Sequence, residues 1–211
     1  FLMMECLADL HVHIGQAKNH PVKITASRRL SLDNIYDYCI NKKGIDIVGI
    51  VDCASPFVIE EIQEQLNNEK IVPLPGGGVR FKDKLSIISG AEIETTEPNG
   101  VAHSIAFFPF FNQIKDFSLI MSKYIANINL SSQKARLCAK ELLNIVKTLG
   151  GVLIPAHVFT PFKSFYGNCY DRLSYAFEDE LDNIFSVELG LSADTDFADT
   201  ISELRTKSYL S

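Results

Sequence analysis

Ala8-Asp9-Leu10-His11-Val12-His13 is the stretch of sequence from which the fold can be inferred. Successive side chains of a β-strand point to opposite faces, so a His-x-His pair places both imidazoles on the same face. Two imidazoles in that arrangement can hold one metal ion, which then needs further ligands from elsewhere in the chain. The stretch therefore predicts a strand that carries the first ligands of a metal site.

Later apolar runs bring further side chains that can bind a metal. The run 47–51 ends at Asp52, and the run 85–91 ends at Glu92. His103 and His157 also lie at apolar strand ends, whereas His20 stands apart from such a run. A lone histidine at a strand end is usually structural, but four of the five histidines share this setting. The pattern favours a metal enzyme whose ligands come from strand ends.

Strand and helix patterns alternate along the chain. We expect helices over about 32–43, 56–66, 113–125, 132–149 and 194–204, with strands over 5–12, 47–51, 85–92, 101–108, 152–156 and 184–187. A turn at 97–100 joins two of these strands, and the residues 207–210 look like the opening of one more. Repeated strand-then-helix order predicts an α/β fold. Polar residues at the carboxyl ends of the strands fit a barrel better than an open sheet.

Composition limits the class of protein. The 211 residues are 46% apolar and 22% charged, which suits one domain spanning 1–211. No apolar run approaches the roughly 20 residues of a membrane span, so we expect no membrane association and a cytoplasmic location. The net charge of −6 argues against a general nucleic-acid binder but allows a local basic rim. The five cysteines predict neither a disulfide framework nor a zinc ribbon, and no glycine fingerprint indicates a nucleotide cofactor.

Several motifs resemble the polymerase and histidinol phosphatase (PHP) superfamily of metal-dependent phosphoesterases. In chain order they are Asp9-Leu10-His11-Val12-His13, Asp52, Gly90-Ala91-Glu92, Ala102-His103-Ser104 and Pro155-Ala156-His157. The stretches 23–27, 74–78, 154–163 and 187–192 look like the branch related to endonuclease Q. This resemblance implies a distorted TIM-like (β/α)7 barrel that holds two or three divalent metal ions.

The resemblance also implies a role for each ligand. His11 and His13 would hold a first ion, Glu92 would bridge two ions, and His103 and His157 would complete the second. Glu92 and His157 would thus also belong to the catalytic centre. Histidine-rich ligation suits zinc, manganese or iron better than magnesium or calcium.

At four further positions, which are Asp52, Cys53, His20 and Glu188, the sequence leaves more than one role open. Asp52 matches an acidic position of the superfamily and is expected as a metal ligand, with a helix N-terminal or loop hydrogen bond near Ser55 as the alternative. Cys53 follows where many relatives have histidine, which speaks against a full third site, and a structural role is favoured for it and for His20. Glu188 closes another apolar run and could approach the site or pair with a basic loop residue.

The two ends of the chain suggest a fragment. The superfamily closes its site with an Asp-x-His motif on a final strand, and the chain reaches Ser211 where that strand should begin. Phe1 is also not an ordinary initiator residue. We therefore expect a PHP domain that lacks its last strand or strands, and whose activity in isolation is uncertain.

The resemblance to endonuclease Q implies a metal-activated water that hydrolyses DNA on the 5′ side of a deaminated base or an abasic site, as in DNA repair. Lys23, Arg28, Lys163 and Phe162 are candidates for substrate contacts, together with Arg29, Phe159, Phe165 and Tyr166, although a solvated loop would look the same. Two alternatives stay open. One is a small-molecule phosphomonoesterase of the histidinol-phosphatase type, and the other is a PHP module without catalytic activity.

Overall fold

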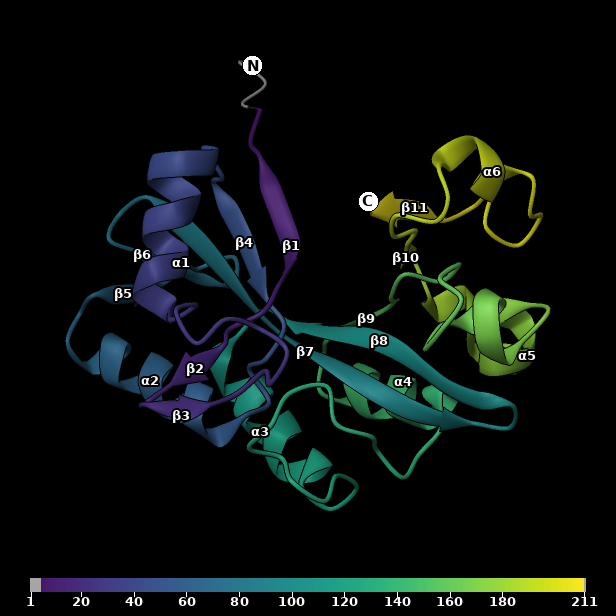
Figure 1. Cartoon of the computed structure of the whole chain (residues 1–211), viewed down its shortest axis with the longest axis horizontal. Helices are drawn as coiled ribbons and strands as arrows, with labels where there is room; N and C mark the ends of the chain where they lie inside the picture. The colour runs from purple at the N-terminus through teal and green to yellow at the C-terminus, as the bar shows by residue number, and fades with distance from the viewer. Residues whose placement is uncertain (1–4, 211) are drawn as a thin grey trace. The chain divides into compact units, whose positions relative to one another are not determined.

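The computed structural model describes residues 5–210, which form an α/β fold built on a central mixed sheet (Figure 1). The chain divides into two compact units. Of the described residues, unit 1 contains those up to Ala91 together with Phe107–Ser122 and Asn127–Ser131. Unit 2 contains Glu92–Ala106, Lys123–Ala126 and the residues from Ser132 onward. Strands β7 and β8 each contribute residues to both units.

Unit 1 is a mixed sheet with helices. Its elements are β1 (Ala8–Val12), β2 (Gln16–Ala17), β3 (His20–Pro21), α1 (Leu32–Tyr38), the π-helical turn η1 (Cys39–Lys43), β4 (Ile47–Ile50), α2 (Pro56–Asn67), β5 (Ile71–Pro73), β6 (Val79–Phe81), the first part of β7 (Leu85–Glu97) and α3 (Phe111–Met121). The strand order is β1-β4-β7-β6-β5, parallel as far as β7 and antiparallel beyond it. The parallel strands β1 and β4 therefore have their carboxyl ends at the same edge of the sheet, as expected.

Local sequence explains where the first helices of unit 1 begin and end. The Ser31 hydroxyl accepts a hydrogen bond from the Asn34 backbone N–H and caps α1. Gly44 ends the following π-helical turn with a φ of 66°, a conformation that glycine adopts without steric cost. Pro56 opens α2 at its first turn, as the sequence predicts.

Unit 2 is built around the far ends of a long hairpin. Its elements are the second part of β7, most of β8 (Gly100–Phe108), α4 (Ala139–Thr148), β9 (Val152–Pro155), the π-helical turn η2 (Phe165–Cys169), α5 (Leu173–Phe177), the 3-10 turn η3 (Glu178–Asn183), β10 (Ser186–Glu188), α6 (Thr195–Asp199) and β11 (Ser208–Leu210). Strand β8 pairs with β7 on one side and with β9 on the other. Strands β10 and β11 form a separate parallel pair.

Two expected helices are shorter than predicted. The stretch 132–149 is helical only in α4, because Ala135 bridges Ile125 and its backbone N–H donates to the Glu94 carbonyl. Tertiary hydrogen bonds thus override the helical periodicity of that segment. The last expected helix, 194–204, is reduced to α6, which Asp194 caps by accepting from the Phe197 N–H.

Residues 5–210 form no closed barrel. The β5–β6 and β6–β7 pairs are antiparallel, and β10 and β11 pair only with each other within the described residues. The predicted (β/α)7 barrel is therefore not confirmed by the described residues. The barrel and the single domain both stay predictions. Phe1 and Ser211, on which the expectation of a fragment depends, lie outside the described residues.

Candidate metal centre

Three side chains of unit 2 converge on one point. The Glu92 Oε1 atom lies 2.8 Å from His103 Nδ1 and 3.5 Å from His157 Nε2. One ligand atom from each of the three residues lies within 4.8 Å of the others, so the group could hold a metal ion. Glu92 and His103 are only 3% and 6% exposed. A carboxylate and two imidazoles in such a setting are typical ligands of zinc and related transition metals.

The sheet of unit 2 explains this convergence. Glu92 lies on β7 and His103 on β8, and the two strands are joined by a tight turn at Pro98-Asn99. On the other side of β8, the Ala156 N–H donates to the His103 carbonyl at 2.9 Å, which brings the end of β9 alongside. His157 comes directly after that contact. Three neighbouring strands therefore deliver the three side chains.

His157 needs special support from the backbone. Its φ is 34°, a conformation that residues other than glycine rarely adopt. The Glu188 carboxylate accepts the His157 backbone N–H at 2.9 Å, and the Val158 N–H donates to the Glu188 carbonyl. Gly190 makes room, because a Cβ there would lie 2.9 Å from the Cβ of His157. Glu188, whose role was open from sequence, thus holds the turn that presents His157.

A second carboxylate contacts His103 from its other side. Glu94 Oε2 lies 3.1 Å from His103 Nε2 and 2.7 Å from Lys163 Nζ. Burial raises the pKa of Glu94, but hydrogen bonds from Lys163 and His103 outweigh it and leave the pKa below its usual value. Glu94 is therefore ionised at neutral pH. Glu94 was not among the predicted site residues, although its place two residues after Glu92 puts both side chains on one strand face.

The residues of unit 2 fit a bound cation. Neutral His103 has one N–H, yet a carboxylate oxygen faces each ring nitrogen. If the N–H donates to Glu94, the lone pair of Nδ1 faces the Glu92 oxygen, and a cation between them would turn this repulsion into attraction. The Ser132 hydroxyl donates to the other oxygen of Glu92. The donor set thus has the chemistry of a metal centre.

Unit 1 holds another histidine–carboxylate group. His11 and His13 lie with their ring centroids 5.2 Å apart, as expected for a His-x-His pair on one strand face. Asp52, 1% exposed, accepts the Ile14 backbone N–H at 2.5 Å and lies 2.8 Å from His13 Nδ1. The Ser131 hydroxyl also donates to this carboxylate. Asp52 therefore does more than hydrogen-bond locally near Ser55, and metal ligation by His11, His13 and Asp52 stays a prediction.

Cys53 and His20 are the two candidates for which a structural role was favoured from sequence. Cys53 is fully buried, its Sγ lies 3.2 Å from the Ile50 carbonyl, and burial raises the pKa of the thiol to about 12. It is an inert thiol rather than a ready ligand. His20 stacks on Phe57 with ring centroids 4.1 Å apart. Both placements agree with the structural roles favoured from sequence.

The predicted substrate contacts divide into exposed and buried side chains. Phe162 is 79% exposed, and the Lys163 side chain is 53% exposed even though it pairs with Glu94. Arg28 is exposed and Lys23 is half-buried in a loop of unit 1. Phe165 is fully buried against Phe177, so a base-stacking role for it is wrong. Phe159 instead stacks on Tyr166, with centroids 5.2 Å apart.

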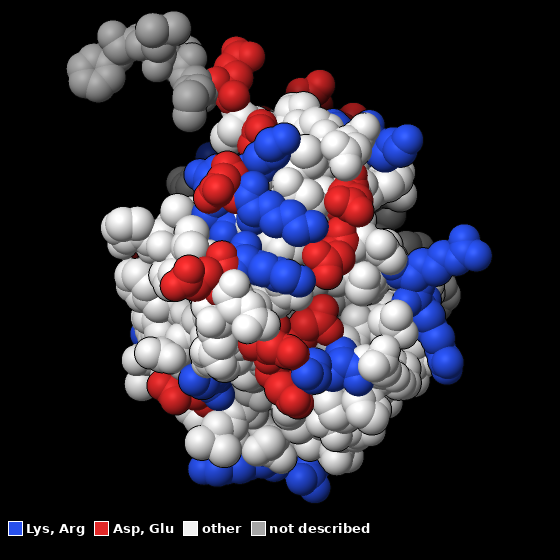
Figure 2. All heavy atoms as spheres, turned by 90° about the vertical axis from the view of Figure 1, so that its left-hand side faces the viewer, with Lys and Arg blue, Asp and Glu red and all other residues white. Residues whose placement is uncertain are grey.

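Charge on the surface is mixed. Figure 2 shows acidic and basic side chains interspersed on the face that it presents, without a broad area of positive charge. This distribution matches the net charge of −6. On this face, binding of a polyanion would therefore depend on a few placed cations rather than on a broad positive area.

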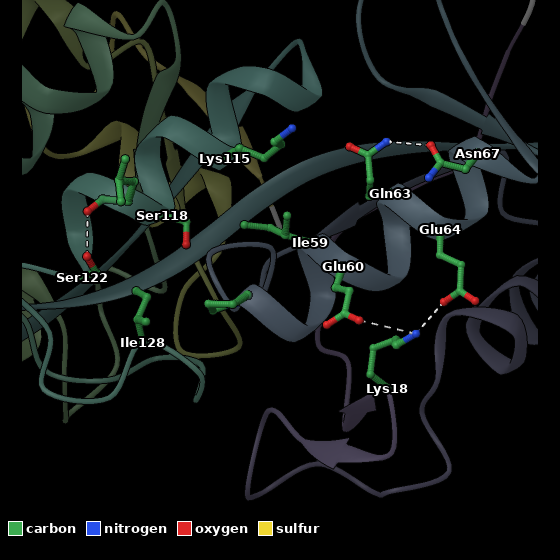
Figure 3. A pocket seen from close by; sticks show the side chains of 12 residues that line it. Lys18, Ile59, Glu60, Gln63, Glu64, Asn67, Lys115, Ser118, Ser122 and Ile128 are labelled. Carbon is green, nitrogen blue, oxygen red and sulfur yellow. Dashed lines mark hydrogen bonds and ion pairs between the residues drawn. The ribbon is translucent and has the colours of Figure 1, made fainter.

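A hollow of unit 1 lies apart from the predicted ligands. It runs between α2 and α3, has a volume of about 580 Å³, and is lined by Ile59, Leu119 and Ile128 among others (Figure 3). Lys18 closes one end, with its Nζ 2.6 Å from Glu64 Oε2 and 3.7 Å from Glu60 Oε1. None of the predicted metal ligands lines this hollow. Its internal ion pairs give it no evident catalytic chemistry.

Comparison with curated proteins finds two relatives. The chain is 39% identical over 212 residues to the uncharacterized protein YqxK of Bacillus subtilis (strain 168), covering 99% of the chain and 54% of YqxK. It is 29% identical over 154 residues to the uncharacterized protein MJ0043 of Methanocaldococcus jannaschii, covering 72% of the chain and 16% of MJ0043. The chain thus spans about half or less of the length of these relatives. No protein-family model matches it.

Comparison with solved structures decides the fold. The lesion-specific endonuclease PfuEndoQ of Pyrococcus furiosus matches with a TM-score of 0.82 and 28% identity, over 97% of the chain and 47% of PfuEndoQ. The chain is similar in fold to about half of that endonuclease Q. A structure of endonuclease Q with a 27-mer duplex carrying an abasic lesion matches with a TM-score of 0.81 and 29% identity, over 98% of the chain and 48% of that protein.

A third structure shares the fold alone. It is a proposed metal-dependent phosphoesterase of Bifidobacterium adolescentis, with a TM-score of 0.51 and 12% identity over 87% of the chain and 77% of that protein. The expected likeness to metal-dependent phosphoesterases is therefore confirmed at the level of the fold. Among the described residues, no helix has the length and apolar character that crossing a membrane requires.

Proposed function

We propose that the chain carries the metal-binding part of a phosphodiesterase that nicks DNA on the 5′ side of deaminated bases or abasic sites, on a PHP-type scaffold in the cytoplasm. The convergence of His103 Nδ1 and His157 Nε2 on Glu92 Oε1 carries this proposal, since it is a donor set for a transition metal. Similarity to endonuclease Q at 28% identity supports the choice of DNA as substrate. DNA repair is the corresponding biological role.

Different residues of the proposed site would hold different metal ions. Glu92, His103 and His157 would hold one ion, and His11 and His13 with Asp52 would supply ligands for another. A bound zinc, manganese or iron ion would lower the pKa of a water that it binds and offset charge on the leaving oxygen. Glu92 and His157 also lie at the catalytic centre, where burial of Glu92 strengthens its electrostatic effect.

Lys163 and Phe162 would contact the substrate. The Lys163 ammonium pairs with Glu94 yet is half exposed, so it can also meet a phosphate oxygen. Phe162 presents a ring to solvent next to it and can stack on a base. Lys23 and Arg28 would add phosphate contacts from unit 1. A polymer with both phosphates and bases fits this pair of side chains better than a small phosphate ester does.

The test combines metal analysis with nicking. The chain is incubated with Mn²⁺ and labelled duplexes that carry uracil, hypoxanthine, an abasic site or no lesion, with PfuEndoQ as the positive control. We expect bound metal and lesion-dependent nicks on the 5′ side. The His157→Ala variant should lose nicking, whereas His20→Ala, which removes an imidazole outside the site, should not.

Other outcomes would redirect the assignment. Metal binding with hydrolysis of small phosphate monoesters but not of DNA would favour the phosphomonoesterase alternative. Metal binding without any hydrolysis by the chain, alongside an active PfuEndoQ, would favour a module that needs further protein for catalysis. Absence of metal after dialysis against Zn²⁺ and Mn²⁺ would overturn the enzymatic proposal.

A further inference from the structure

His103 lies between two buried carboxylates, which sets it apart from His157, the other histidine of unit 2. Its Nδ1 lies 2.8 Å from Glu92 Oε1, and its Nε2 lies 3.1 Å from Glu94 Oε2. The exposed fractions of the three residues are 9% or less. Which nitrogen carries the proton therefore decides which nitrogen can bind a metal.

Glu94 is fixed in place by Lys163. The same oxygen, Glu94 Oε2, faces both His103 Nε2 and Lys163 Nζ, the latter at 2.7 Å. The backbone of Lys163 is also tied to His103, since the His103 N–H donates to the Lys163 carbonyl at 3.0 Å. Lys163 adopts a φ of 55°, so its backbone is held in a turn rather than extended. The acceptor that faces Nε2 is thus anchored from a second segment of the chain.

The pairing register of β7 and β8 explains why Glu94 contacts His103. Strands β7 and β8 are joined by a two-residue turn, which places position 94 opposite position 103 when the ladder runs without a bulge. Glu92, two residues earlier on the same face, then lies diagonally across from His103. One hairpin face therefore offers His103 a carboxylate for each ring nitrogen.

We propose that Glu94, held by Lys163, is a positioning residue that keeps the proton of His103 on Nε2, so that His103 binds the metal through Nδ1. The inference rests on the proposed metal-dependent function and adds the ligating atom and the residue that selects it. Carboxylates that hold the second nitrogen of a ligating histidine fix its tautomer and raise the basicity of the ligand.

His157 provides an internal contrast. Its Nδ1 lies 3.2 Å from the Thr160 hydroxyl, whose proton can go to a backbone carbonyl, and its Nε2 faces Glu92. An Nδ1–H donated to Thr160 leaves Nε2 as the ligating atom. The two histidines of one metal centre are thus expected to bind through different nitrogens.

Nitrogen NMR tests the ligating atom directly. The chain is labelled with ¹⁵N-histidine, and long-range proton–nitrogen spectra are recorded before and after addition of Zn²⁺, with His103→Ala and His157→Ala used for assignment. We expect His103 to show a zinc-bound Nδ1 with the proton on Nε2, and His157 the reverse. A zinc-bound Nε2 in His103 would overturn the proposal, and this result needs no variant at Glu94.

Zinc titration tests the role of Glu94. The Glu94→Gln amide can both accept and donate, so it no longer selects one tautomer, and we expect zinc affinity to fall by about 10- to 100-fold. Glu97→Gln is the matched control, because Glu97 lies on the same strand and its carboxylate accepts from the Ala139 N–H and the Tyr170 hydroxyl. Equal loss in both variants, or no loss in Glu94→Gln, would contradict the proposal.

The failure of this inference is distinguishable from failure of the proposed function. A wild-type chain that binds neither Zn²⁺ nor Mn²⁺ would overturn the metal-dependent function itself. A wild-type chain that binds zinc with His103 ligating through Nε2 would leave that function standing and remove only the role of Glu94. Lys163→Met should weaken zinc binding less than Glu94→Gln, because the carboxylate itself remains.

Discussion

Each unit of the molecule pairs a histidine with a carboxylate, but the two carboxylates are held differently. In unit 1, Asp52 accepts a backbone N–H from Ile14 as well as contacting His13. In unit 2, the contacts of the Glu94 carboxylate are with the side chains of His103 and Lys163. The first carboxylate therefore supports the backbone as well as contacting a histidine, whereas the second contacts side chains. A histidine–carboxylate pair can thus involve a carboxylate that also holds the backbone, or one that contacts side chains and can orient the imidazole.

Removal of Glu92 should have the largest effect on metal binding in unit 2, because its carboxylate faces both His103 and His157. We expect Glu92→Ala to weaken Zn²⁺ binding by more than about 100-fold, beyond the 10- to 100-fold typical of outer residues. Isothermal titration calorimetry measures the change, with His20→Ala as a control that keeps wild-type affinity. An affinity close to wild type would show that Glu92 is not a ligand.

Asp52→Ala should chiefly reduce stability. It leaves the buried Ile14 N–H without its acceptor, which costs about 1–3 kcal/mol in unfolding free energy. Glu94→Ala should cost less, because the buried His103 ring can then donate from Nδ1 to Glu92, 2.8 Å away, and the half-exposed Lys163 side chain can return to water. Urea unfolding followed by circular dichroism compares the two variants. Equal losses would remove the distinction between the two carboxylates.

Two glycines separate backbone strain from crowding of the site. Gly44 and Gly190 both have positive φ, 66° and 72°, so an alanine at either costs roughly 1–2 kcal/mol. A Cβ at Gly44 meets nothing within 4 Å, whereas one at Gly190 would lie 2.9 Å from the His157 Cβ. We expect Gly190→Ala to be the less stable variant and the only one of the two with weakened Zn²⁺ binding.

Calorimetry and urea unfolding of both glycine variants check that expectation. Unchanged zinc affinity in Gly190→Ala would mean that the position of His157 does not matter for binding. Weakened affinity in Gly44→Ala would point to a general loss of structure instead.

The smallest effect is expected at Cys53. Burial raises the pKa of its thiol to about 12, so thiolate is scarce at pH 8 and the side chain is closed to solvent. A thiol reagent at pH 8 should modify the exposed Cys6 first and Cys53 only after unfolding, as peptide mapping can show. Fast labelling of Cys53 in the folded chain would reopen a metal role beside Asp52.

Patterns of short range were predictable from sequence. The closeness of the His11 and His13 rings at the end of β1, the cap at Ser31 and the end of the π-helical turn at Gly44 depend on neighbouring residues, and all three are present. The helix expected over 132–149 was too long, because Ala135 takes part in hydrogen bonds with residues distant in sequence. Periodicity alone does not reveal such competition.

The sequence by itself determined which side chains could bind a metal, since His-x-His and acids at the ends of apolar runs are local patterns. Only the tertiary structure decided what surrounds them. Glu94 faces His103 because a hairpin folds β7 onto β8, and Glu188 holds the His157 N–H because a later strand comes alongside. These contacts join residues 9 and 31 positions apart, and their geometry depends on strand pairing that no single stretch of sequence encodes.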